Sequence, residues 1–337
     1  MKNLLIRALV VFVVILGAAA AVVAVYVART WDRVYDVPLV DLHASSDPAV
    51  IKRGQYLVFG PAHCVECHVG SRDLLAEHPL AAGETVPLSG GMKFPIGPLG
   101  TIYSRNLTPD PETGIGRYSD GQLARMMRYA VRPDGKASIP PMMPFDNLSD
   151  EDVVAVISFL RAQTPVRHVI PENQWTLMGK VLKSFVPTAL PRRVVNASAT
   201  SPAQAPTRER GEYLARYAGN CVGCHTPRNQ TTYMPTGPEF AGGQEVESEP
   251  VAGADPNVMF RIPNLTPAPG SALLKFPDRE TFIARFQRGG RQKVGSPMPW
   301  EAFSRISTED LGALYEFLHS LPPAKGPTGE TAFRKTN

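Results

Sequence analysis

Cys64-Val65-Glu66-Cys67-His68 is one of two copies of the same short pattern, and the other is Cys221-Val222-Gly223-Cys224-His225. The chain has four cysteines, and the two patterns contain all of them. On the first turn of a helix, positions i, i+3 and i+4 share a face, so two thiols and one imidazole can hold one cofactor. Cys-x-x-Cys-His is the attachment pattern of c-type haem. The sequence therefore predicts two covalently bound haem c groups, one on each pattern.

Two other interpretations of the cysteines are a structural zinc site of four thiolates and a redox-active dithiol. A shared zinc site would have to join segments about 157 residues apart, and it would leave His68 and His225 as coincidences. A redox dithiol does not require a histidine after its second cysteine. The duplicated histidine therefore favours haem attachment over both alternatives.

The duplication is much longer than the cysteine pattern, which indicates two copies of a whole domain. Four further segments recur at offsets of about 155 to 158 residues: Arg53-Gly54-Gln55-Tyr56-Leu57 as Arg210-Gly211-Glu212-Tyr213-Leu214, Asn106-Leu107-Thr108-Pro109 as Asn264-Leu265-Thr266-Pro267, Met143-Pro144-Phe145 as Met298-Pro299-Trp300, and Ser149-Asp150-Glu151-Asp152 as Ser307-Thr308-Glu309-Asp310. Residues 47–165 are called the first repeat and residues 208–325 the second repeat. Each is predicted to be one haem-binding domain, with residues 166–207 as the linker.

Each repeat is predicted to consist mainly of short helices, which makes the predicted fold class all-α. Asp47 before a proline is a typical helix start, and Ser119 followed by Gln122 has the form of a capping box. The last helix of the first repeat begins at the cap Ser149 and places apolar side chains at helical spacing. The Gly- and Pro-rich residues 87–116 are predicted to form a loop around the flat cofactor.

A histidine-ligated iron needs a sixth ligand if it is to transfer electrons, and methionine is the usual partner. Met298 has no rival within its loop of the second repeat, so it is predicted to bind the same iron as His225. The equivalent loop of the first repeat contains both Met142 and Met143. The shared Met-Pro-aromatic pattern favours Met143 as the partner of His68, with Met142 as the alternative. Packing in the core is the other interpretation of each methionine.

The first 30 residues differ from the rest of the chain. Lys2 and Arg7 precede an apolar stretch, residues 8–28, that has no charged side chain. As a helix this stretch is roughly 31 Å long, which matches a hydrocarbon core of about 30 Å. A cleaved signal usually has an apolar core of only about 7–15 residues, so a retained membrane anchor is favoured over a signal. Lys2 and Arg7 place the N-terminus in the cytoplasm, and the haem domains of this single-pass protein are then periplasmic, on the outer side of the inner membrane.

Charge excludes some classes of function. The chain of 337 residues has a net charge of +4, which is too small and too evenly spread for a nucleic-acid-binding protein. Basic side chains precede each methionine loop: Arg125, Arg128, Arg132 and Lys136 in the first repeat, and Arg285, Arg288, Arg291 and Lys293 in the second. They are predicted either to steer an acidic redox partner or to form a solvated helix face.

The linker has two parts of different composition. Residues 196–207 are rich in Ala, Ser, Thr and Pro and are predicted to be flexible. The earlier part mixes apolar with basic side chains: Trp175, Leu177, Met178, Val181, Leu182 and Phe185 among Lys180, Lys183, Arg192 and Arg193. It is interpreted either as an amphipathic segment lying on the membrane or a partner subunit, or as a strap across the two haem domains.

The segment Gly100-Thr-Ile-Tyr-Ser-Arg-Asn-Leu-Thr-Pro-Asp-Pro-Glu-Thr-Gly-Ile-Gly116, with Ser119-Asp120 and the Pro-Met-Pro loop, resembles the multihaem cytochrome c subunits of membrane-bound alcohol and gluconate dehydrogenases. The resemblance covers residues 53–322 and implies class I cytochrome c domains, export, and electron delivery toward a respiratory chain. By the same match, one haem is served by Cys64, Cys67, His68 and Met143, and the other by Cys221, Cys224, His225 and Met298. Those subunits typically have three haem domains and a cleaved signal, whereas this chain has two domains and a predicted anchor.

These features predict a membrane-anchored diheme cytochrome that relays single electrons and is not itself an enzyme. Its redox partners are expected to be a dehydrogenase or a quinol-oxidising complex as donor, and an oxidase or another acceptor. The alternative is a diheme enzyme, such as a cytochrome c peroxidase or a dehydrogenase of small sulfur compounds. Peroxidase chemistry needs an open or displaceable sixth position on one iron, and a methionine in each repeat argues against it.

Overall fold

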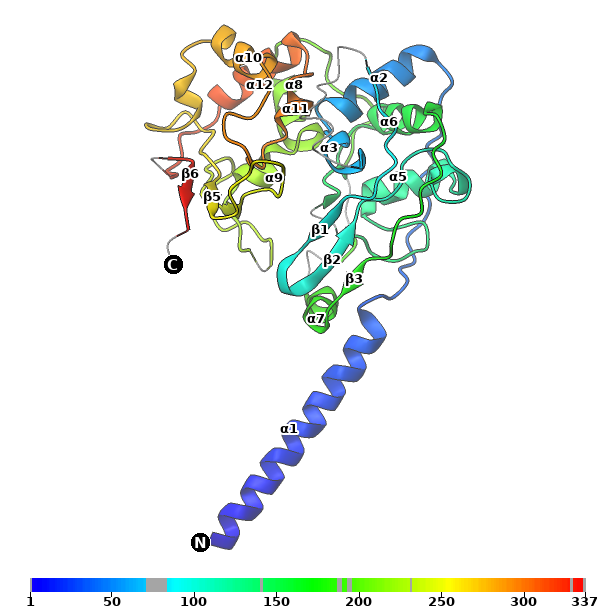
Figure 1. The fold of residues 1–337 in the computed structure, drawn as a ribbon, viewed down its shortest axis with the longest axis vertical. Helices are drawn as coiled ribbons and strands as arrows, with labels where there is room; N and C mark the ends of the chain where they lie inside the picture. The colour runs from blue at the N-terminus through cyan, green and yellow to red at the C-terminus, as the bar shows by residue number, and fades with distance from the viewer. Residues whose placement is uncertain are drawn as a thin grey trace.

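A long N-terminal helix stands apart from a body formed by the two repeats (Figure 1). The computed structural model describes residues 2–70, 84–139, 142–186, 190–192, 196–230, 232–327 and 330–335. The long helix, α1 (Lys2–Thr30), is long and apolar enough to cross a membrane, a property that a signal sequence near the N-terminus would share.

The first repeat consists of helices around a short hairpin. It contains α2 (Pro48–Phe59), α3 (Val65–His68), α5 (Asp120–Tyr129) and α6 (Asp150–Ala162), the strands β1 (Lys93–Pro95) and β2 (Gly100–Tyr103), and the 3-10 turns η1 (Gly97–Leu99) and η2 (Ile115–Arg117). The predicted helix starts are confirmed by their caps, which are Asp47, Ser119 with Gln122, and Ser149. The apolar side of α6 faces the core, where Ile157 is fully buried.

The second repeat has the same main elements in the same order, with the helix α11 and the turn η5 in addition. It contains α8 (Arg208–Tyr213), the π-helical turn η5 (Leu214–Ala218), α9 (Cys221–His225), the strands β4 (Glu245–Glu247) and β5 (Val258–Arg261), η6 (Leu273–Lys275), α10 (Arg279–Gln287), α11 (Trp300–Phe303) and α12 (Thr308–His319). α8 packs on α12 as α2 packs on α6. The repetition of the sequence is therefore also a repetition of structure.

Each repeat also contributes to a three-stranded sheet, so the prediction of an all-α fold is only partly correct. β1 and β2 form an antiparallel hairpin, and β3 (Gln174–Trp175) pairs with β2. β4 and β5 form the equivalent hairpin, and β6 (Ala332–Arg334) pairs with β5. Strands this short show no alternation of apolar and polar residues that would predict a strand. Gly and Pro lie beside them, so the sequence predicts a loop at residues 87–116.

The third strand of each sheet comes from outside its repeat. β3 and the helix after it, α7 (Leu177–Phe185), belong to the predicted linker, and β6 follows residue 325. Later in the linker, Asp150 N donates to Ser198 O at 2.9 Å, and Ser201 N donates to Glu151 Oε1 at 2.8 Å. Residues 196–207 are thus attached to the start of α6, although their composition predicted a flexible chain.

The two long helices of each repeat meet at a glycine. A Cβ at Gly54 on α2 would lie 1.9 Å from Ala155 O of α6. A Cβ at Gly211 on α8 would lie equally close, 1.9 Å, to Ala313 O of α12. Neither contact has room for a side chain, because Cβ atoms essentially never approach other atoms below 3.0 Å. This explains why both copies of the Arg-Gly-x-Tyr-Leu pattern contain glycine.

Gly54→Ala is expected to lower the free energy of unfolding by about 2–3 kcal/mol, because α2 and α6 must move apart to admit the methyl group. Gly211→Ala should act in the same way in the second repeat. Gly312→Ala is the matched control, since its nearest neighbours are side-chain carbons at 3.1 and 3.4 Å. Urea unfolding of the haem-loaded protein, followed by circular dichroism, measures all three, and equal stability of Gly54→Ala and Gly312→Ala would refute the steric explanation.

Candidate haem-binding sites

The histidines of the two cysteine patterns end short helices and are held in the same way. His68 ends α3, and His225 ends α9. Nδ1 of His68 lies 2.7 Å from Arg105 O, and Nδ1 of His225 lies 2.8 Å from Pro263 O. A carbonyl oxygen can only accept a hydrogen bond, so Nδ1 carries the proton and Nε2 keeps its lone pair. Each imidazole is therefore set to present Nε2 to a metal.

Burial keeps the imidazoles in the form that binds metal. Desolvation lowers the pKa of His225 to about 4 and also lowers the pKa of His68. The same effect raises the pKa of Cys64 and of Cys221 to about 12, so these thiols stay protonated near neutral pH. None of the four cysteines is in a disulfide. Neutral imidazoles and cysteines that are not oxidised to a disulfide are what covalent haem attachment requires.

The repeated Asn-Leu-Thr-Pro segments fix the carbonyl groups that accept from the histidines. Asn106 Oδ1 accepts from Thr108 N and Oγ1 at 2.9 and 2.7 Å, and Asn106 Nδ2 donates to Val166 O at 2.8 Å. Asn264 makes the same contacts with Thr266 and with the chain after α12. The residue before each asparagine supplies the accepting carbonyl. These segments, to which the sequence assigned no structural role, thus orient the two imidazoles.

Two glycine pairs beside the histidines are not among the repeated segments identified in the sequence. Gly90 N donates to the carbonyl of the first histidine at 2.8 Å, and Gly242 N donates to that of the second at 2.7 Å. Both glycines have a φ of +69°, and a Cβ at Gly90 would lie 2.5 Å from Arg105 O. The signal was present, because Gly90-Gly91 returns as Gly242-Gly243. Only glycine fits this backbone conformation so close to the histidine's acceptor.

The predicted methionine of the first repeat lies in a loop that an arginine holds. Met143 is half-buried and packs against the core, whereas Met142 is 50% exposed. Arg128 on α5 donates to Asp146 O at 3.0 Å and also to Leu148 O, both just after Met143. Burial therefore supports Met143 over Met142 as a ligand.

The methionine loop of the second repeat is held on both sides. Met298 is half-buried and packs against the core. The guanidinium of Arg285 on α10 lies 3.6 Å from the ring centre of Trp300, which follows the methionine by two residues. Before the methionine, Arg291 donates to Ser296 O at 2.5 Å. Both methionines thus lie half-buried in loops fixed by arginine.

Several basic side chains before the methionine loops are internal, which contradicts both predictions made for them. Arg125, Arg128 and Arg285 are only 9, 3 and 8% exposed. Arg125 donates to three backbone carbonyls at 3.1, 2.8 and 3.1 Å. Lys136 is paired with Asp32 at 2.5 Å. These four cations bind backbone and carboxylates of the chain itself, so they form neither a steering patch nor a solvated helix face. Arg288 and Lys293 are exposed, and for these two both predictions stand.

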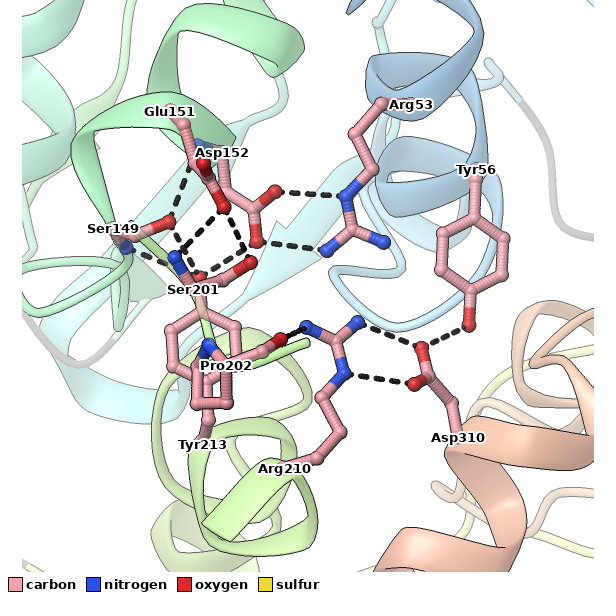
Figure 2. Close-up of polar contacts among 10 residues, drawn as sticks. All are labelled: Arg53, Tyr56, Ser149, Glu151, Asp152, Ser201, Pro202, Arg210, Tyr213 and Asp310. Atoms are coloured by element: carbon pink, nitrogen blue, oxygen red, sulfur yellow. Dashed lines mark hydrogen bonds and ion pairs between the residues drawn. The ribbon is translucent and has the colours of Figure 1, made fainter. Parts of the chain in front are cut away.

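An ion pair fixes the helix contact in each repeat (Figure 2). Arg53 on α2 binds Asp152 on α6 through two hydrogen bonds of 2.8 and 2.9 Å. Arg210 on α8 binds Asp310 on α12 through two bonds of the same lengths, 2.8 and 2.9 Å. The second pair is almost fully buried, and the first carboxylate is buried as well. Two hydrogen bonds in each pair fix the orientation of the guanidinium group relative to the carboxylate.

Tyrosines connect these ion pairs across the boundary between the repeats (Figure 2). Tyr56 of the first repeat donates to Asp310 of the second at 2.6 Å. In return, Tyr213 of the second repeat donates to Asp152 of the first at 2.7 Å. Burial and the nearby carboxylate raise the pKa of both tyrosines, so each remains a donor. This reciprocal joint fixes one repeat relative to the other.

A second contact between the repeats is one-sided. Glu66, inside the first cysteine pattern, is 3% exposed and accepts from Ala302 N on α11 at 3.0 Å. Arg291 lies 3.5 Å from the same carboxylate, and it pairs with Glu249 and Glu301 at 2.9 Å each. The second pattern has glycine at the position of this glutamate. The first attachment helix, α3, therefore contacts the helix that follows the second methionine loop.

The donor set of each repeat fits haem c. It comprises two thiols outside any disulfide, one neutral imidazole and one half-buried thioether, which are Cys64, Cys67, His68 and Met143, and Cys221, Cys224, His225 and Met298. In the part of the chain that the structure describes, no three His, Cys, Asp or Glu side chains gather to hold a metal ion, so the four-cysteine zinc alternative has no site there. Fold and sites together define a c-type cytochrome with two attachment sites.

Comparison with curated proteins gives the same class. The chain is 33% identical over 297 residues to the cytochrome c subunit of alcohol dehydrogenase (quinone) from Gluconobacter oxydans, covering 82% of this chain and 56% of that subunit. It is 29% identical to the fructose dehydrogenase cytochrome subunit of Gluconobacter japonicus, with coverages of 86% and 56%. It is 30% identical over 223 residues to a diheme cytochrome c-type of Cereibacter sphaeroides, with coverages of 63% and 66%. No family model matches the chain.

The chain is therefore a c-type cytochrome related to the cytochrome c subunits of dehydrogenases, and it binds two covalently attached haem c groups. It spans little more than half the length, 56%, of the alcohol and fructose dehydrogenase subunits that it matches. Electron transfer by a cytochrome is the activity that these relatives share.

Tyr56→Phe and Tyr213→Phe are each expected to lower the free energy of unfolding by about 1.5–3 kcal/mol, because each removes a hydrogen bond to a buried carboxylate. The double variant should lose the joint and unfold in two transitions instead of one. Tyr217→Phe is the control, since its ring packs beside Tyr213 but its hydroxyl has no part in the joint. Urea unfolding reports all four proteins, and an unchanged single transition in the double variant would show that the joint does not couple the repeats.

Arg291→Met is expected to lower the free energy of unfolding by about 3–5 kcal/mol, because it leaves Glu66, Glu249 and Glu301 together without their guanidinium. Arg261→Met is the matched control, as its ion pair with Glu245 at 2.7 Å is solvent-accessible and should contribute less than about 1 kcal/mol. The same unfolding experiment compares them. Equal decreases in the free energy of unfolding for both variants would mean that burial of the Arg291 cluster adds nothing to its contribution to stability.

Proposed function

We propose that this chain is a membrane-anchored diheme cytochrome that relays single electrons from a respiratory donor to an oxidase or another acceptor. The observation that carries the proposal is the fixed contact between the first attachment helix and the helix after the second methionine loop. α3, which contains His68, packs against α11, which begins two residues after Met298. A relay needs two redox sites in a constant relation, and the reciprocal joint and the Glu66 contact supply it.

The repeats are proposed as class I cytochrome c domains, at residues 47–165 and 208–325. The proposed attachment residues and iron ligands are Cys64, Cys67, His68 and Met143 in the first domain and Cys221, Cys224, His225 and Met298 in the second. When bound, each haem supplies reversible one-electron chemistry between ferrous and ferric iron. The protein holds both imidazoles by Nδ1 hydrogen bonds and both methionine loops by arginine, so that neither ligand set has to rearrange.

The half-buried methionine of each repeat favours a relay over an enzyme. Peroxidase or sulfur-compound chemistry requires a sixth position that a substrate can reach. Met143 and Met298 are both half-buried against the core, in loops that Arg128 and Arg285 hold in place. With both positions taken, neither site is expected to bind or activate a substrate.

A dehydrogenase is the donor that the relatives favour. Their names describe cytochrome subunits of alcohol, fructose and gluconate dehydrogenases. By analogy, this chain would accept electrons from a dehydrogenase subunit that oxidises a small organic substrate. The diheme relative supports a second version, in which a quinol-oxidising complex is the donor and the cytochrome stands alone between it and an oxidase.

α1 is proposed as a retained, single-pass anchor in the inner membrane. Lys2 and Arg7 at its beginning keep that end in the cytoplasm, and both repeats are then periplasmic. Tyr26 and Trp31 lie at its other end, and aromatic rings of this kind are enriched at membrane–water interfaces. The exported side of the membrane is where a covalent cytochrome would meet periplasmic donors.

The relay predicts two low-spin haems, each with the near-infrared band of methionine–iron ligation. Met143→Leu and Met298→Leu should each remove about half of that band and lower one of the two midpoint potentials, because the thioether raises the potential of its iron. Absorption spectroscopy and redox titration of the purified protein measure both effects.

Met142→Leu is the matched control for these variants and should leave the spectrum and both potentials unchanged. Loss of the band in Met142→Leu in place of Met143→Leu would reassign the ligand while leaving the relay intact. A high-spin haem in the unmodified protein would instead contradict the relay and favour a diheme enzyme.

A further inference from the structure

α7 presents apolar side chains to solvent on one of its sides. Leu177, Met178 and Phe185 are 75, 54 and 51% exposed. Leu177, Val181 and Phe185 follow each other at steps of four residues, so they lie on the same side of the helix. Apolar side chains grouped in this way on a protein surface mark a binding face.

The place of α7 in the molecule indicates what binds there. Phe185, its last residue, stacks on Tyr26 of α1 with ring centroids 5.0 Å apart. Tyr26 is two residues before Ala28, the end of the apolar stretch, which corresponds to about 3 Å of helix rise. When α1 spans the bilayer, Phe185 therefore lies where hydrocarbon gives way to headgroups. Figure 1 shows α7 at the edge of the body next to α1.

The side chains around α7 have the composition of a membrane interface. Lys180 Nζ lies 4.7 Å from the ring centre of Trp31, and Lys183 Nζ lies 4.8 Å from that of Trp175. Tryptophan rings are enriched at headgroup depth, and Lys180 can bury its stem there while its ammonium group reaches water. Lys183 is only 8% exposed and belongs to the buried side of α7. A lipid surface therefore suits the exposed side of this helix.

α7 is attached to the first repeat in one orientation. Thr176 caps the helix and donates from Oγ1 to Pro98 O at 2.6 Å. A Cβ at Gly179 would lie 2.2 Å from Leu99 O, so the helix touches the backbone at the end of η1. β3, directly before α7, pairs with β2. Whatever surface binds α7 therefore orients the first repeat as well.

We propose that α7 lies in the lipid headgroup layer, with Leu177, Met178 and Phe185 among the acyl chains. The inference rests on the proposed anchoring by α1 and adds a second point of membrane contact. A single spanning helix leaves the attached body free to tilt and turn, whereas a surface helix beside it fixes one face toward the bilayer. That face determines from which side a membrane-bound redox partner can reach the first attachment site.

Photolabelling of the haem-loaded full chain in phospholipid nanodiscs tests this inference. The probe is a phosphatidylcholine with a photoactivatable group on its acyl chain, and adducts are located by mass spectrometry of peptides. Adducts are expected on residues 8–28 and on residues 177–185. Leu274, an apolar side chain of the second repeat that is 47% exposed, should carry none.

The triple variant Leu177→Gln, Met178→Gln, Phe185→Gln should lower adduct yield on residues 177–185 by about tenfold or more, with residues 8–28 labelled as before. Leu274→Gln should change neither yield. Labelled residues 8–28 with unlabelled α7 would overturn the inference while leaving the anchor standing, and would assign the apolar face to a protein partner. Labelled α7 in a mature chain that lacks residues 8–28 would support it while removing the proposed anchor.

Discussion

Two buried carboxylates, Asp152 and Asp310, determine how this protein is assembled. Burial of a carboxylate destabilises the folded state unless hydrogen-bond donors contact its oxygens. Here each carboxylate accepts from one arginine and one tyrosine. The arginine of its own repeat fixes the packing of two long helices. The tyrosine of the other repeat fixes the position of the neighbouring domain. The same two side chains therefore set the internal geometry of each repeat and the relation between the two cofactor sites.

The cofactor sites depend on backbone groups more than on side chains. The histidine hydrogen bonds end on the carbonyl oxygens that precede the repeated asparagines. A glycine of each repeated pair donates to the backbone carbonyl of the histidine itself. The arginines before the methionine loops act in the same way, since Arg125 and Arg128 also donate to carbonyls. Much of the polar chemistry of this protein thus serves to hold loops that the cofactor alone could not order.

The fold could be predicted from sequence wherever local chemistry decides it. Serine caps and the cysteine patterns are determined by residues within a few positions, and repetition made them visible twice. Gly54 was visible only as part of a repeat, because the carbonyl that it meets lies on the distant helix α6. The sheets were missed because strands of two to four residues carry no periodic signal. The sequence shows the repeated Arg-Gly-x-Tyr-Leu pattern, but the partner of its tyrosine is distant. Tyr56 donates to Asp310, which is 254 residues further along the chain. Such a partner cannot be inferred from spacing in the sequence. The burial of Arg128 cannot be inferred either, because arginine side chains are usually exposed.

The reciprocal tyrosines give the contact between the repeats the form of an isologous interface, in which both partners present the same patch. Two separate copies of a single repeat would match each other in the same way, and the linker holds the two patches at high effective concentration. Joining them in one chain has a further consequence, because each copy can then change without the other. Glu66 faces the second repeat, while the matching position keeps glycine and makes no such contact. Two repeats that would form a symmetric dimer are therefore no longer equivalent, and the first and second sites are distinct.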